Sequence, residues 1–314
     1  MHSTDSPKNA VILFNPLAGR GKASAVAAKA KKALVTQHWN VLDCIASTHA
    51  GHIEKDLASQ FGDKVELFVL IGGDGTLREL IAGLRTCQLK PEIAFIPMGN
   101  ANVVARELGI PLQANHAIEV LKSTSVKHID IGVLKQEHKA EQIFLAMLEI
   151  GFGAKIVAVV DRLRNGSLRG LYKIWGDLVY AIAGLIALRG LSSSTFNTRI
   201  DNDTEYKTSN HAVFANMQTY AKGWSLTPDA KYDDGLLDSA VSQRNSAIST
   251  LITFMAAARR KKLKPTLMAY QTGKKIEIES ENSLFVQIDG DPIEFAGNAS
   301  ITLERDACTI RVPD

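Results

Sequence analysis

The sequence predicts an α/β fold in two parts: an N-terminal domain with a doubly wound, mostly parallel sheet, and a second domain that is β-rich and mostly antiparallel. In the first part, short apolar runs alternate with helical patterns, and each run ends in a turn that contains Gly or Pro. Beyond Asp130, strand-like segments follow one another closely and are separated by Asp-Gly, Gly-Lys and Asn-containing turns. A length of 314 residues also suits two domains. We place them at residues 1–132 and 133–314.

The first domain begins with the apolar run Ala10–Phe14, and Ser24–Val35 follows with Ala and Lys at helical spacing. Further apolar runs are Val41–Ile45, Leu67–Ile71 and Ile93–Ile96. Runs that are apolar throughout indicate parallel strands covered by helices on both faces. We therefore expect functional residues at the carboxyl ends of these strands.

The second domain is predicted from a series of strand-like segments and two helical stretches. The strands are expected at Thr195–Ile200, His211–Met217, Leu236–Val241, Lys275–Glu279, Leu284–Ile288, Ser300–Leu303 and Thr309–Val312. The helical stretches are Lys155–Leu191 and Ser246–Lys262.

Composition excludes several classes of protein. With 36 Lys and Arg against 33 Asp and Glu, the net charge of +3 does not indicate a nucleic-acid binder. The three cysteines are far apart, so they form neither a disulfide framework nor a zinc ligand set. Residues 1–8 contain no apolar core of a signal peptide, and the run Leu178–Leu188 is shorter than a spanning helix needs. We expect no transmembrane segment and a cytoplasmic location.

The strongest motif is Leu70–Leu77, which reads LIGGDGTL. Glycines after a strand let backbone N–H groups approach a phosphate, and the following helix N-terminus favours an anion. Asp74 would repel phosphate unless it binds a metal or accepts a proton, so it predicts a phosphoryl-transfer centre. Thr76 is expected to cap a helix that begins near Leu77. The alternative interpretation is an ordinary tight turn with a helix cap.

Two further turns follow predicted strands. Phe14–Lys22 is rich in Gly but matches neither the Walker A pattern nor G-x-G-x-x-G. Ile96–Asn102 reads IPMGNAN. Because the carboxyl ends of parallel strands meet at one edge, we expect the three turns to converge and form a nucleotide cleft.

These motifs together resemble the diacylglycerol-kinase catalytic-domain family of lipid kinases, which includes sphingosine and ceramide kinases and soluble bacterial relatives. The resemblance covers nearly the whole chain. In chain order the matching segments are Asn15-Pro16 with Gly19, Thr48 with Gly51, Gly72–Thr76 (GGDGT), Pro97–Asn102, Asp130–Gly132, Asn216–Gly223, Lys231–Asp238 and Gln287–Asp291. GGDGT alone is shared with NAD kinases, but its combination with the late Asp289-Gly290 pair is more specific.

The resemblance implies ATP and Mg²⁺ as cofactors and assigns roles to residues. Asp289 and Asp74 would be the catalytic acids nearest the acceptor hydroxyl and the Mg-ATP. Asp234, with backbone oxygens of Lys231 and Leu236, would form a structural magnesium site, and Asp130 would belong to the water and magnesium network. The nucleotide site would comprise Asn15, Thr48, Gly72, Gly73, Gly75, Thr76, Gly99, Asn100, Asn102, Arg169 and Asp291.

The expected function is transfer of the γ-phosphoryl group of Mg-ATP to a hydroxyl of a diacylglycerol-like or related lipid, in a cleft between the domains. One alternative is an NAD kinase. Another is a nucleotide- and lipid-binding regulator with weak turnover, because Asn100, Val103 and Asp291 depart from the Thr or Ser, Asp and Glu that are common in the family.

The lipid side of the sequence allows two interpretations. Arg162, Arg164, Arg169 and Lys173 precede the apolar run Leu178–Leu188, which suits either peripheral attachment to an anionic membrane or a helix packed on the β domain. Arg169 is alternatively a triphosphate contact. The basic run Arg259–Lys264 suits either membrane docking or a solvated helix end. Whether the protein is a homodimer stays open.

The pair His49 and His52 has the spacing of a metal site but no acidic or Cys partner nearby in sequence, so we expect a solvated turn.

Overall fold

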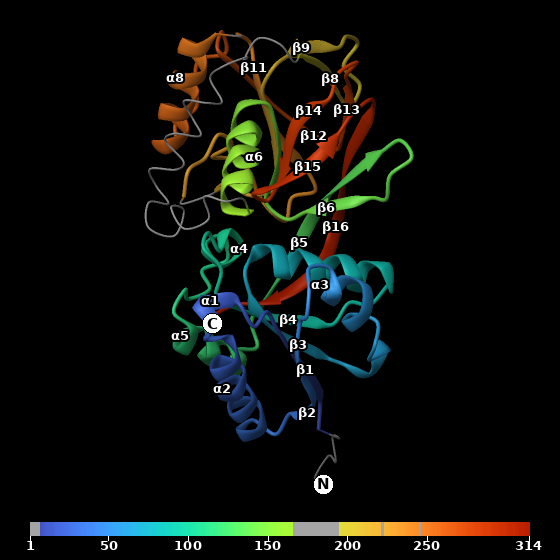
Figure 1. The fold of residues 1–314 in the computed structure, drawn as a ribbon, viewed down its shortest axis with the longest axis vertical. Helices are drawn as coiled ribbons and strands as arrows, with labels where there is room; N and C mark the ends of the chain where they lie inside the picture. Colours follow the sequence, from blue (N-terminus) through green and yellow to red (C-terminus); the bar gives the residue numbers. More distant parts are fainter. Residues whose placement is uncertain (1–6, 166–194, 221–222, 245) are drawn as a thin grey trace. The chain divides into compact units, whose positions relative to one another are not determined.

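The computed structural model describes residues 7–165, 195–220, 223–244 and 246–314. The chain forms two compact units (Figure 1). Unit 1 combines Met1–Asp130 with Arg305–Asp314, and unit 2 is Ile131–Glu304. The predicted fold class, a mostly parallel α/β part followed by a mostly antiparallel β-rich part, is confirmed.

Unit 1 is built on a parallel sheet with the strand order β2-β1-β3-β4. Its strands are β1 (Asn9–Phe14), β2 (Asn40–Ala46), β3 (Leu67–Gly72) and β4 (Glu92–Pro97). All six residues of β3 are buried, as the unbroken apolar run predicts. The chain moves from β1 to β2 in one direction and from β2 to β3 and β4 in the other. With right-handed crossovers, this reversal places helices on both faces of the sheet.

The helical segments of unit 1 are short except for two. They are α1 (Ala18–Gly21), α2 (Ala23–Thr36), the π-helical η1 (Ile53–Leu57), η2 (Gly62–Lys64), α3 (Asp74–Thr86), α4 (Val103–Glu107), α5 (Ala114–Glu119) and η3 (Val120–Lys122). Helix α2 buries Ala23, Val26, Ala27, Ala30 and Leu34, whose spacing forms one helix face, and it contacts β1, β2 and β3. Helix α3 contacts β3 and η1, while α5 packs against α2.

Unit 2 contains antiparallel sheets and two described helices. The elements are the end of β5 (Val126–Gln136), β6 (Gln142–Phe144), β7 (Met147–Ile150), α6 (Phe152–Asn165), β8 (Phe196–Ile200), β9 (Lys207–Ser209), β10 (Ala212–Ala215), β11 (Leu237–Ser242), α8 (Ala247–Ala258), β12 (Met268–Gly273), β13 (Lys275–Glu279), β14 (Leu284–Ile288), β15 (Asp291–Phe295) and the start of β16 (Ala299–Arg311). Six strands form one sheet in the order β12-β11-β10-β7-β14-β15, and β16-β13-β8-β9 form another run of neighbours.

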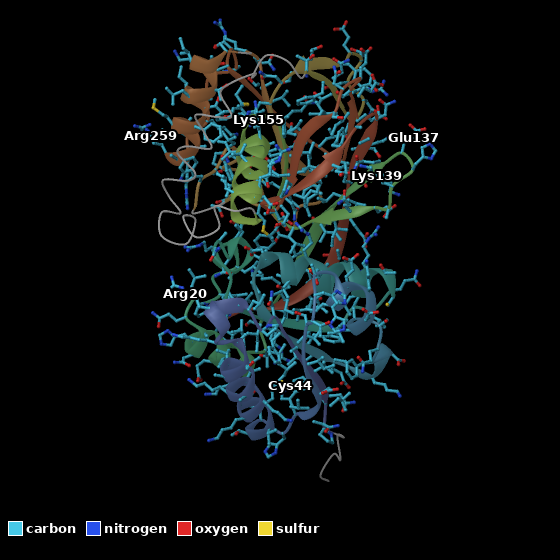
Figure 2. The ribbon with its side chains drawn as sticks, in the orientation of Figure 1. Arg20, Cys44, Glu137, Lys139, Lys155 and Arg259 are labelled. Carbon is cyan, nitrogen blue, oxygen red and sulfur yellow. The ribbon has the colours of Figure 1, made fainter. Side chains whose placement is uncertain are left out.

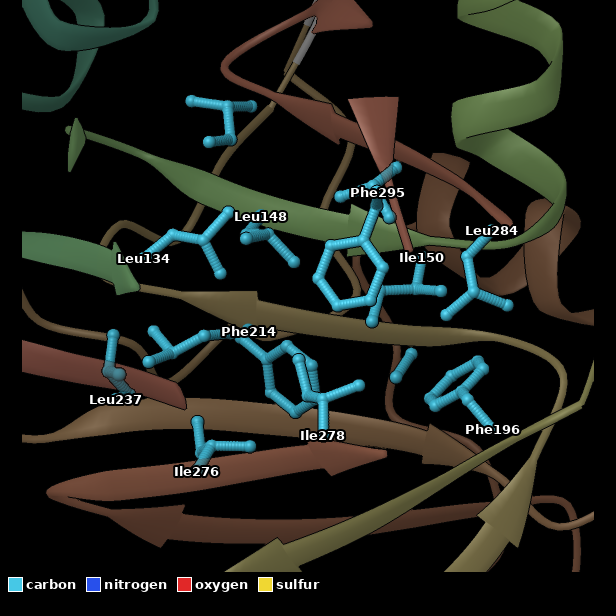
Figure 3. Packing of buried hydrophobic residues seen from close by; sticks show 14 of the residues in the cluster. Leu134, Leu148, Ile150, Phe196, Phe214, Leu237, Ile276, Ile278, Leu284 and Phe295 are labelled. Carbon is cyan, nitrogen blue, oxygen red and sulfur yellow. The ribbon is translucent and has the colours of Figure 1, made fainter. Parts of the chain in front are cut away.

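The core of unit 2 lies between these two layers of strands. Phe214 and Leu148 from the six-stranded sheet meet Phe196 and Ile278 from the other layer in one buried cluster (Figure 3). Burial alternates along β8 and β13, because one face of each strand packs into this cluster and the other faces outward.

The C-terminal part of the chain differs from the sequence prediction. Ser300–Leu303 and Thr309–Val312 were expected as two strands, but Ala299–Arg311 is one strand, β16. The polar residues between them are typical of a turn, and Asp306 has φ 47°, yet the strand continues through them because β16 pairs with β5 and the Asp306 N–H donates to the buried carboxylate of Asp130. The end of β16 pairs with β4 in parallel, which assigns residues 305–314 to unit 1.

The helices that the structure describes are shorter than the predicted helical stretches. Helix α6 begins at Phe152, before the predicted start, and residues 166–194 of that stretch lie outside the described residues. Helix α8 ends at Ala258, so the basic run Arg259–Lys264 follows the helix. In the described parts of the chain, no helix is long and apolar enough to cross a membrane.

Candidate functional site

Three turns at the carboxyl ends of β1, β3 and β4 are joined by backbone hydrogen bonds within unit 1. The N–H of Asn15 donates to Ile71 O at 3.0 Å, which holds the first turn beside the end of β3. The N–H of Gly19 donates to Met98 O at 3.0 Å, and the N–H of Met98 donates to Gly72 O at 2.6 Å. The expected convergence of the three Gly-containing turns is therefore found.

Gly73 and Gly99 bring the second and third turns into backbone contact. A Cβ atom on Gly99 would lie 2.6 Å from Gly73 Cα, and one on Gly73 would lie 3.2 Å from Gly99 Cα. Any side chain at Gly99 would push the two turns apart. These glycines thus leave backbone, rather than side chains, as the lining of the turns, which is the surface that a phosphate group can approach.

Asp74 is the first residue of α3, and its carboxylate reaches the start of α4. Oδ2 accepts from the N–H of Val103 at 3.0 Å, and Oδ1 accepts from the N–H of Val104 at 3.1 Å. These N–H groups have no partner within a helix, so Asp74 satisfies two of the open donors of α4. The carboxylate is consequently fixed at the junction of the second and third turns.

Thr76 does not cap a helix that begins near Leu77, contrary to the expectation. Helix α3 already begins at Asp74 with Gly73 as its N-cap, and no side chain provides the cap bond. The extended backbone of Gly73 (φ −103°, ψ −177°) starts the helix three residues earlier than the apolar pattern indicates. The Thr76 side chain instead lies against Gly72, since a Cβ atom added at Gly72 would be 2.8 Å from the Cβ atom of Thr76.

The other nucleotide-site candidates of unit 1 occupy varied positions. Asn102 is buried in a left-handed conformation (φ 48°), and its side-chain amide bonds the N–H and the carbonyl of Gly99, which closes the third turn. Gly75 is the second residue of α3. Asn15 Oδ1 accepts from the N–H of Leu17 at 2.9 Å, whereas Asn100 is exposed.

Thr48 belongs to a turn after β2. Its N–H donates to Nδ1 of His52 at 3.2 Å, and the His49 and His52 rings lie 5.1 Å apart. Across the residues that the structure describes, no three His, Cys, Asp or Glu side chains are grouped to hold a metal ion.

Asp289 of unit 2 occupies a tight turn between β14 and β15 with φ 50°. Its carboxylate accepts from three successive N–H groups, those of Leu145 at 2.9 Å, Ala146 at 2.8 Å and Met147 at 3.1 Å. The Asp289 N–H in turn donates to Met147 O at 3.1 Å. The turn is thereby fixed to the segment that enters β7.

A buried polar group behind this turn was not predicted from the sequence. Glu149 is 2% exposed; its carboxylate lies 3.0 Å from His211 Nε2 and accepts from Gln287 Nε2 at 2.8 Å. Gln287 Oε1 accepts from the N–H of Gly290, so the group connects to the Asp289-Gly290 turn. Burial, followed by the charge of Glu149, raises the pKa of Tyr220 well above its usual value. The one available signal was a Glu within the apolar strand Met147–Ile150.

The loop that contains Asp234 carries concentrated negative charge. Burial first, then the charges of Asp234 and Asp229, raise the pKa of Asp238 to about 6. Asp234 itself is exposed, and its Oδ1 accepts from the N–H of Leu236 at 3.0 Å. A hard cation that binds one carboxylate, backbone oxygens and water suits this donor chemistry.

The remaining candidates are distributed over the chain. Asp130 is 1% exposed in β5, and its Oδ1 accepts from the N–H of Asp306 at 2.9 Å. Asp291 begins β15 opposite Ile288. Arg169 and Lys173 lie outside the described residues, while Arg162 is on α6.

In comparisons with known proteins, two family models together match most of the chain. Residues 9–134 match the family model described as the diacylglycerol kinase catalytic domain, and residues 147–308 match the one described as the YegS C-terminal NAD kinase beta sandwich-like domain. A Pseudomonas aeruginosa (strain UCBPP-PA14) protein named "Probable lipid kinase YegS-like" is 29% identical over 244 residues, which cover 77% of this chain and 74% of the relative. A Staphylococcus carnosus (strain TM300) diacylglycerol kinase is 22% identical over 289 residues, or 90% and 89% of the two chains.

A solved structure of a diacylglycerol kinase from Bacillus anthracis (strain Sterne) has a TM-score of 0.73 and 20% identity, with 98% of this chain and 97% of the other covered. The match extends over both units, and at this identity it supports the fold.

Proposed function

Since this chain belongs to the diacylglycerol-kinase catalytic-domain family of lipid kinases, we propose that it transfers the γ-phosphoryl group of Mg-ATP to a hydroxyl group of a diacylglycerol-like lipid. The observation that supports the proposal most is the convergence of three Gly-containing turns around Asp74 at the carboxyl edge of a parallel sheet. This edge is where α/β sheets bind nucleotides.

Unit 1 would bind the nucleotide. The backbone of the Gly72–Thr76 turn and the first turn of α3 would donate N–H groups to phosphate oxygens. Asn102 keeps the third turn closed through both of its bonds to Gly99, so the backbone lining does not need to rearrange when phosphate binds. Asp74, held by α4, would face the metal-bound phosphates.

Unit 2 would supply Asp289 as the base. The lipid hydroxyl oxygen forms a bond to the γ-phosphorus, the bond from that phosphorus to the β–γ bridging oxygen breaks, and ADP leaves. The hydroxyl proton goes to the Asp289 carboxylate, which three backbone N–H groups hold in one orientation. Pre-set orientation of this kind is the main protein contribution in phosphoryl transfer.

Magnesium fits the donor chemistry of this chain at two places. Asp74 and Asp291 would contact the ion that accompanies ATP, and Asp130 would belong to the surrounding water network. Asp234, with backbone oxygens of Lys231 and Leu236, would hold a structural ion, since an exposed carboxylate beside backbone oxygens and water is a donor set that Mg²⁺ accepts. When bound, Mg²⁺ neutralises charge on the transferred phosphoryl group.

The direct test is a labelled-ATP assay with Mg²⁺ across a panel of micellar lipids: diacylglycerol, phosphatidylglycerol and a sphingoid base. We expect phosphate transfer to at least one lipid and none to NAD. Transfer to NAD would favour the NAD-kinase alternative, and nucleotide and lipid binding without any transfer would favour the regulator.

Asp289→Asn tests the assignment of the base. We expect kcat to fall about 10²–10⁴-fold while the KM for ATP stays within a few-fold, because unit 1 binds the nucleotide. Asp306→Asn is the matched control, since Asp306 shares the left-handed conformation (φ 47° against 50°) but is exposed on β16.

The thermal midpoint must be recorded as well, because an Asn side chain would turn an N–H donor toward the N–H of Leu145. Near-normal turnover in Asp289→Asn together with loss of turnover in Asp74→Asn would assign the base to Asp74.

A further inference from the structure

Helix α8 presents an apolar stripe on its outer face. Ile248, Leu251 and Met255 are 74%, 60% and 47% exposed, and their spacing of three and four residues aligns them along one side of the helix. We call these three residues the α8 stripe. Exposed side chains of this size are normal singly, but an aligned set on one helix indicates a binding surface.

The opposite side of α8 is already used for packing within unit 2. Thr253 and Ala257 are buried, and Ala257 belongs to a cluster with Leu226 and Met268. The helix cannot rotate to bury the stripe without exposing this side. The stripe is therefore a second, separate face.

Aromatic residues support one flank of the helix. Phe254 packs edge-on against Phe152 of α6 with ring centroids 4.9 Å apart, and against Trp224 at 6.2 Å. Trp224 remains 38% exposed. A partly exposed Trp beside an apolar surface is typical of proteins that contact the interfacial region of a lipid bilayer.

A cationic segment follows the stripe directly. Residues 243–264 contain six Lys or Arg and no Asp or Glu, and five of the six lie in Arg259–Lys264. Arg260 Nε donates to Gly223 O at 2.6 Å, Lys262 pairs with Asp229, and Arg259 lies at the end of α8 with its side chain pointing away from the strands (Figure 2). The contacts of Arg260 and Lys262 fix this basic segment to Gly223 and Asp229. Arg259 Nη1 donates to Met255 O at 3.2 Å, which places this cation beside the stripe.

We propose that the α8 stripe and Arg259–Lys264 form a docking surface for an anionic lipid bilayer, which positions the enzyme on the membrane that contains its substrate. The proposal rests on the proposed lipid-kinase function but assigns the contact to a surface outside the reaction site. An apolar stripe that enters the bilayer beside cations that contact anionic head groups is the arrangement of interfacial helices.

Charge complementarity selects the bilayer over a second copy of the chain. A two-fold interface places the same patch on both subunits, which would bring together two segments that each carry five Lys or Arg, of which only Lys262 is described above with an acidic partner. An anionic bilayer offers the opposite charge and an apolar interior to the same surface.

The experiment is co-sedimentation of the full chain with vesicles of phosphatidylcholine alone or mixed with phosphatidylglycerol. Leu251→Ser/Met255→Ser should reduce binding to anionic vesicles by on the order of tenfold or more. Arg259→Gln/Lys261→Gln/Lys264→Gln should reduce it by on the order of 100-fold, at about fivefold for each charge, and salt should have the same effect. Replacement of these three residues leaves the ion pair of Lys262 and the hydrogen bond of Arg260 intact.

Matched controls come from unit 1. Val35→Ser/Leu112→Ser removes two other exposed apolar side chains, and Lys32→Gln/Lys64→Gln/Lys127→Gln removes three other exposed cations. Neither set should change vesicle binding more than twofold. An equal effect of the stripe and control sets would overturn the proposal.

Oligomeric state and accessibility give further decisive outcomes. A dimer in sedimentation velocity that Leu251→Ser/Met255→Ser dissociates would make α8 a subunit interface and overturn the proposal. A thiol introduced by Leu251→Cys in a Cys44→Ser/Cys87→Ser background should react readily without vesicles and be protected by anionic vesicles. Lack of reaction without vesicles would mean that part of the protein covers the α8 stripe, which would overturn the proposal.

Vesicle binding is independent of catalysis, so failure of the kinase proposal and failure of docking are distinguishable. If the chain is a kinase, the stripe variant should keep its rate on a short-chain lipid dispersed as monomers and lose rate on vesicles. Loss of rate on both would contradict a docking role.

Discussion

The local sequence identifies Asp289 and its turn, whereas a segment far away in the sequence orients its carboxylate. The motif identifies the residue, and the Asp-Gly pair suits a turn with positive φ at both positions (50° and 93°). The N–H groups that orient its carboxylate come from Leu145, Ala146 and Met147, over 140 residues earlier in the chain. No local pattern indicates that contact.

Gly153 makes room for the buried Glu149, and its substitution tests how firmly that carboxylate is held. A Cβ atom at Gly153 would lie 1.9 Å from Glu149 Oε1. His211 holds the same oxygen of this carboxylate, and Gln287 holds Oε2. We expect Gly153→Ala to lower the free energy of unfolding by about 1–3 kcal/mol, although Ala normally stabilises a helix relative to Gly. Urea denaturation measures the change.

A double-mutant cycle provides the control for Gly153. In a Glu149→Ala background the new methyl group meets no carboxylate, so Gly153→Ala should cost little, with a coupling of at least about 1 kcal/mol. The same cost in both backgrounds would show that Glu149 does not set the space at Gly153.

At the scale of elements, Arg199 of β8 and Glu277 of β13 form a cross-strand ion pair. Arg199 Nε donates to Glu277 Oε2 at 2.7 Å and Lys275 Nζ donates to Oε1 at 2.8 Å. The bonds from Lys275 and Arg199 lower the pKa of Glu277 from 4.5 to about 2. Because the pKa of the folded state is the lower one, this carboxylate stabilises the fold above pH 4.5, and its contribution is lost as the pH falls toward 2.

Glu277→Gln should therefore destabilise the chain near neutral pH and have little effect in strong acid. The pair is near the surface, so we expect on the order of 0.5 kcal/mol rather than the full value of the shift. Denaturation curves for both proteins across this range measure the difference. Glu281→Gln, at an exposed turn position, is the control, and a difference that grows on acidification would contradict the assigned sign.

The loop Lys231–Leu236 is the element on which the structural magnesium proposal depends. Asp234→Ala should lower the thermal midpoint more in Mg²⁺ than in EDTA, since it removes the one carboxylate assigned to the ion in addition to the bond from the N–H of Leu236. Asp233→Ala, at the exposed neighbouring position, is the matched control. Equal midpoints of Asp234→Ala and the parent chain in Mg²⁺ would remove the assignment.

At the scale of the whole molecule, the last ten residues complete the unit formed by the first 130. Cys308, Ile310 and Val312 are at most 5% exposed, and Arg311 bonds Glu92 and Leu121 O. Burial raises the pKa of the Cys308 thiol to about 12, consistent with an enclosed position.

A chain that ends at Glu304 should lose the fold of unit 1 while unit 2 persists. Three buried apolar side chains contribute about 1.5–3 kcal/mol each, which is a large part of the total stability of a domain. Hydrogen exchange should show lost protection in β1 and β3 but retained protection in β10 and β14. A chain that ends at Val312 is the control; protected β1 and β3 in the shorter chain would contradict the prediction.

The sequence alone determined the α/β and β-rich parts, the turns at the ends of β1, β3 and β4, and the family. These features follow from local periodicity and from glycines whose backbone freedom a turn requires, as at Gly73 and Gly99. Asp74 could be singled out for the same reason, as a carboxylate among glycines after a buried strand.

Only the tertiary structure decided which groups hold the acids in place. Asp74 is fixed by Val103 and Val104, and Glu149 by His211 and Gln287, through bonds between residues 29 to 138 positions apart. The unbroken strand β16 and its place beside β4 also depend on pairing with distant strands. Hydrogen bonds and burial of this kind depend on which segments meet in space, and a local pattern carries no record of a partner that lies far along the chain.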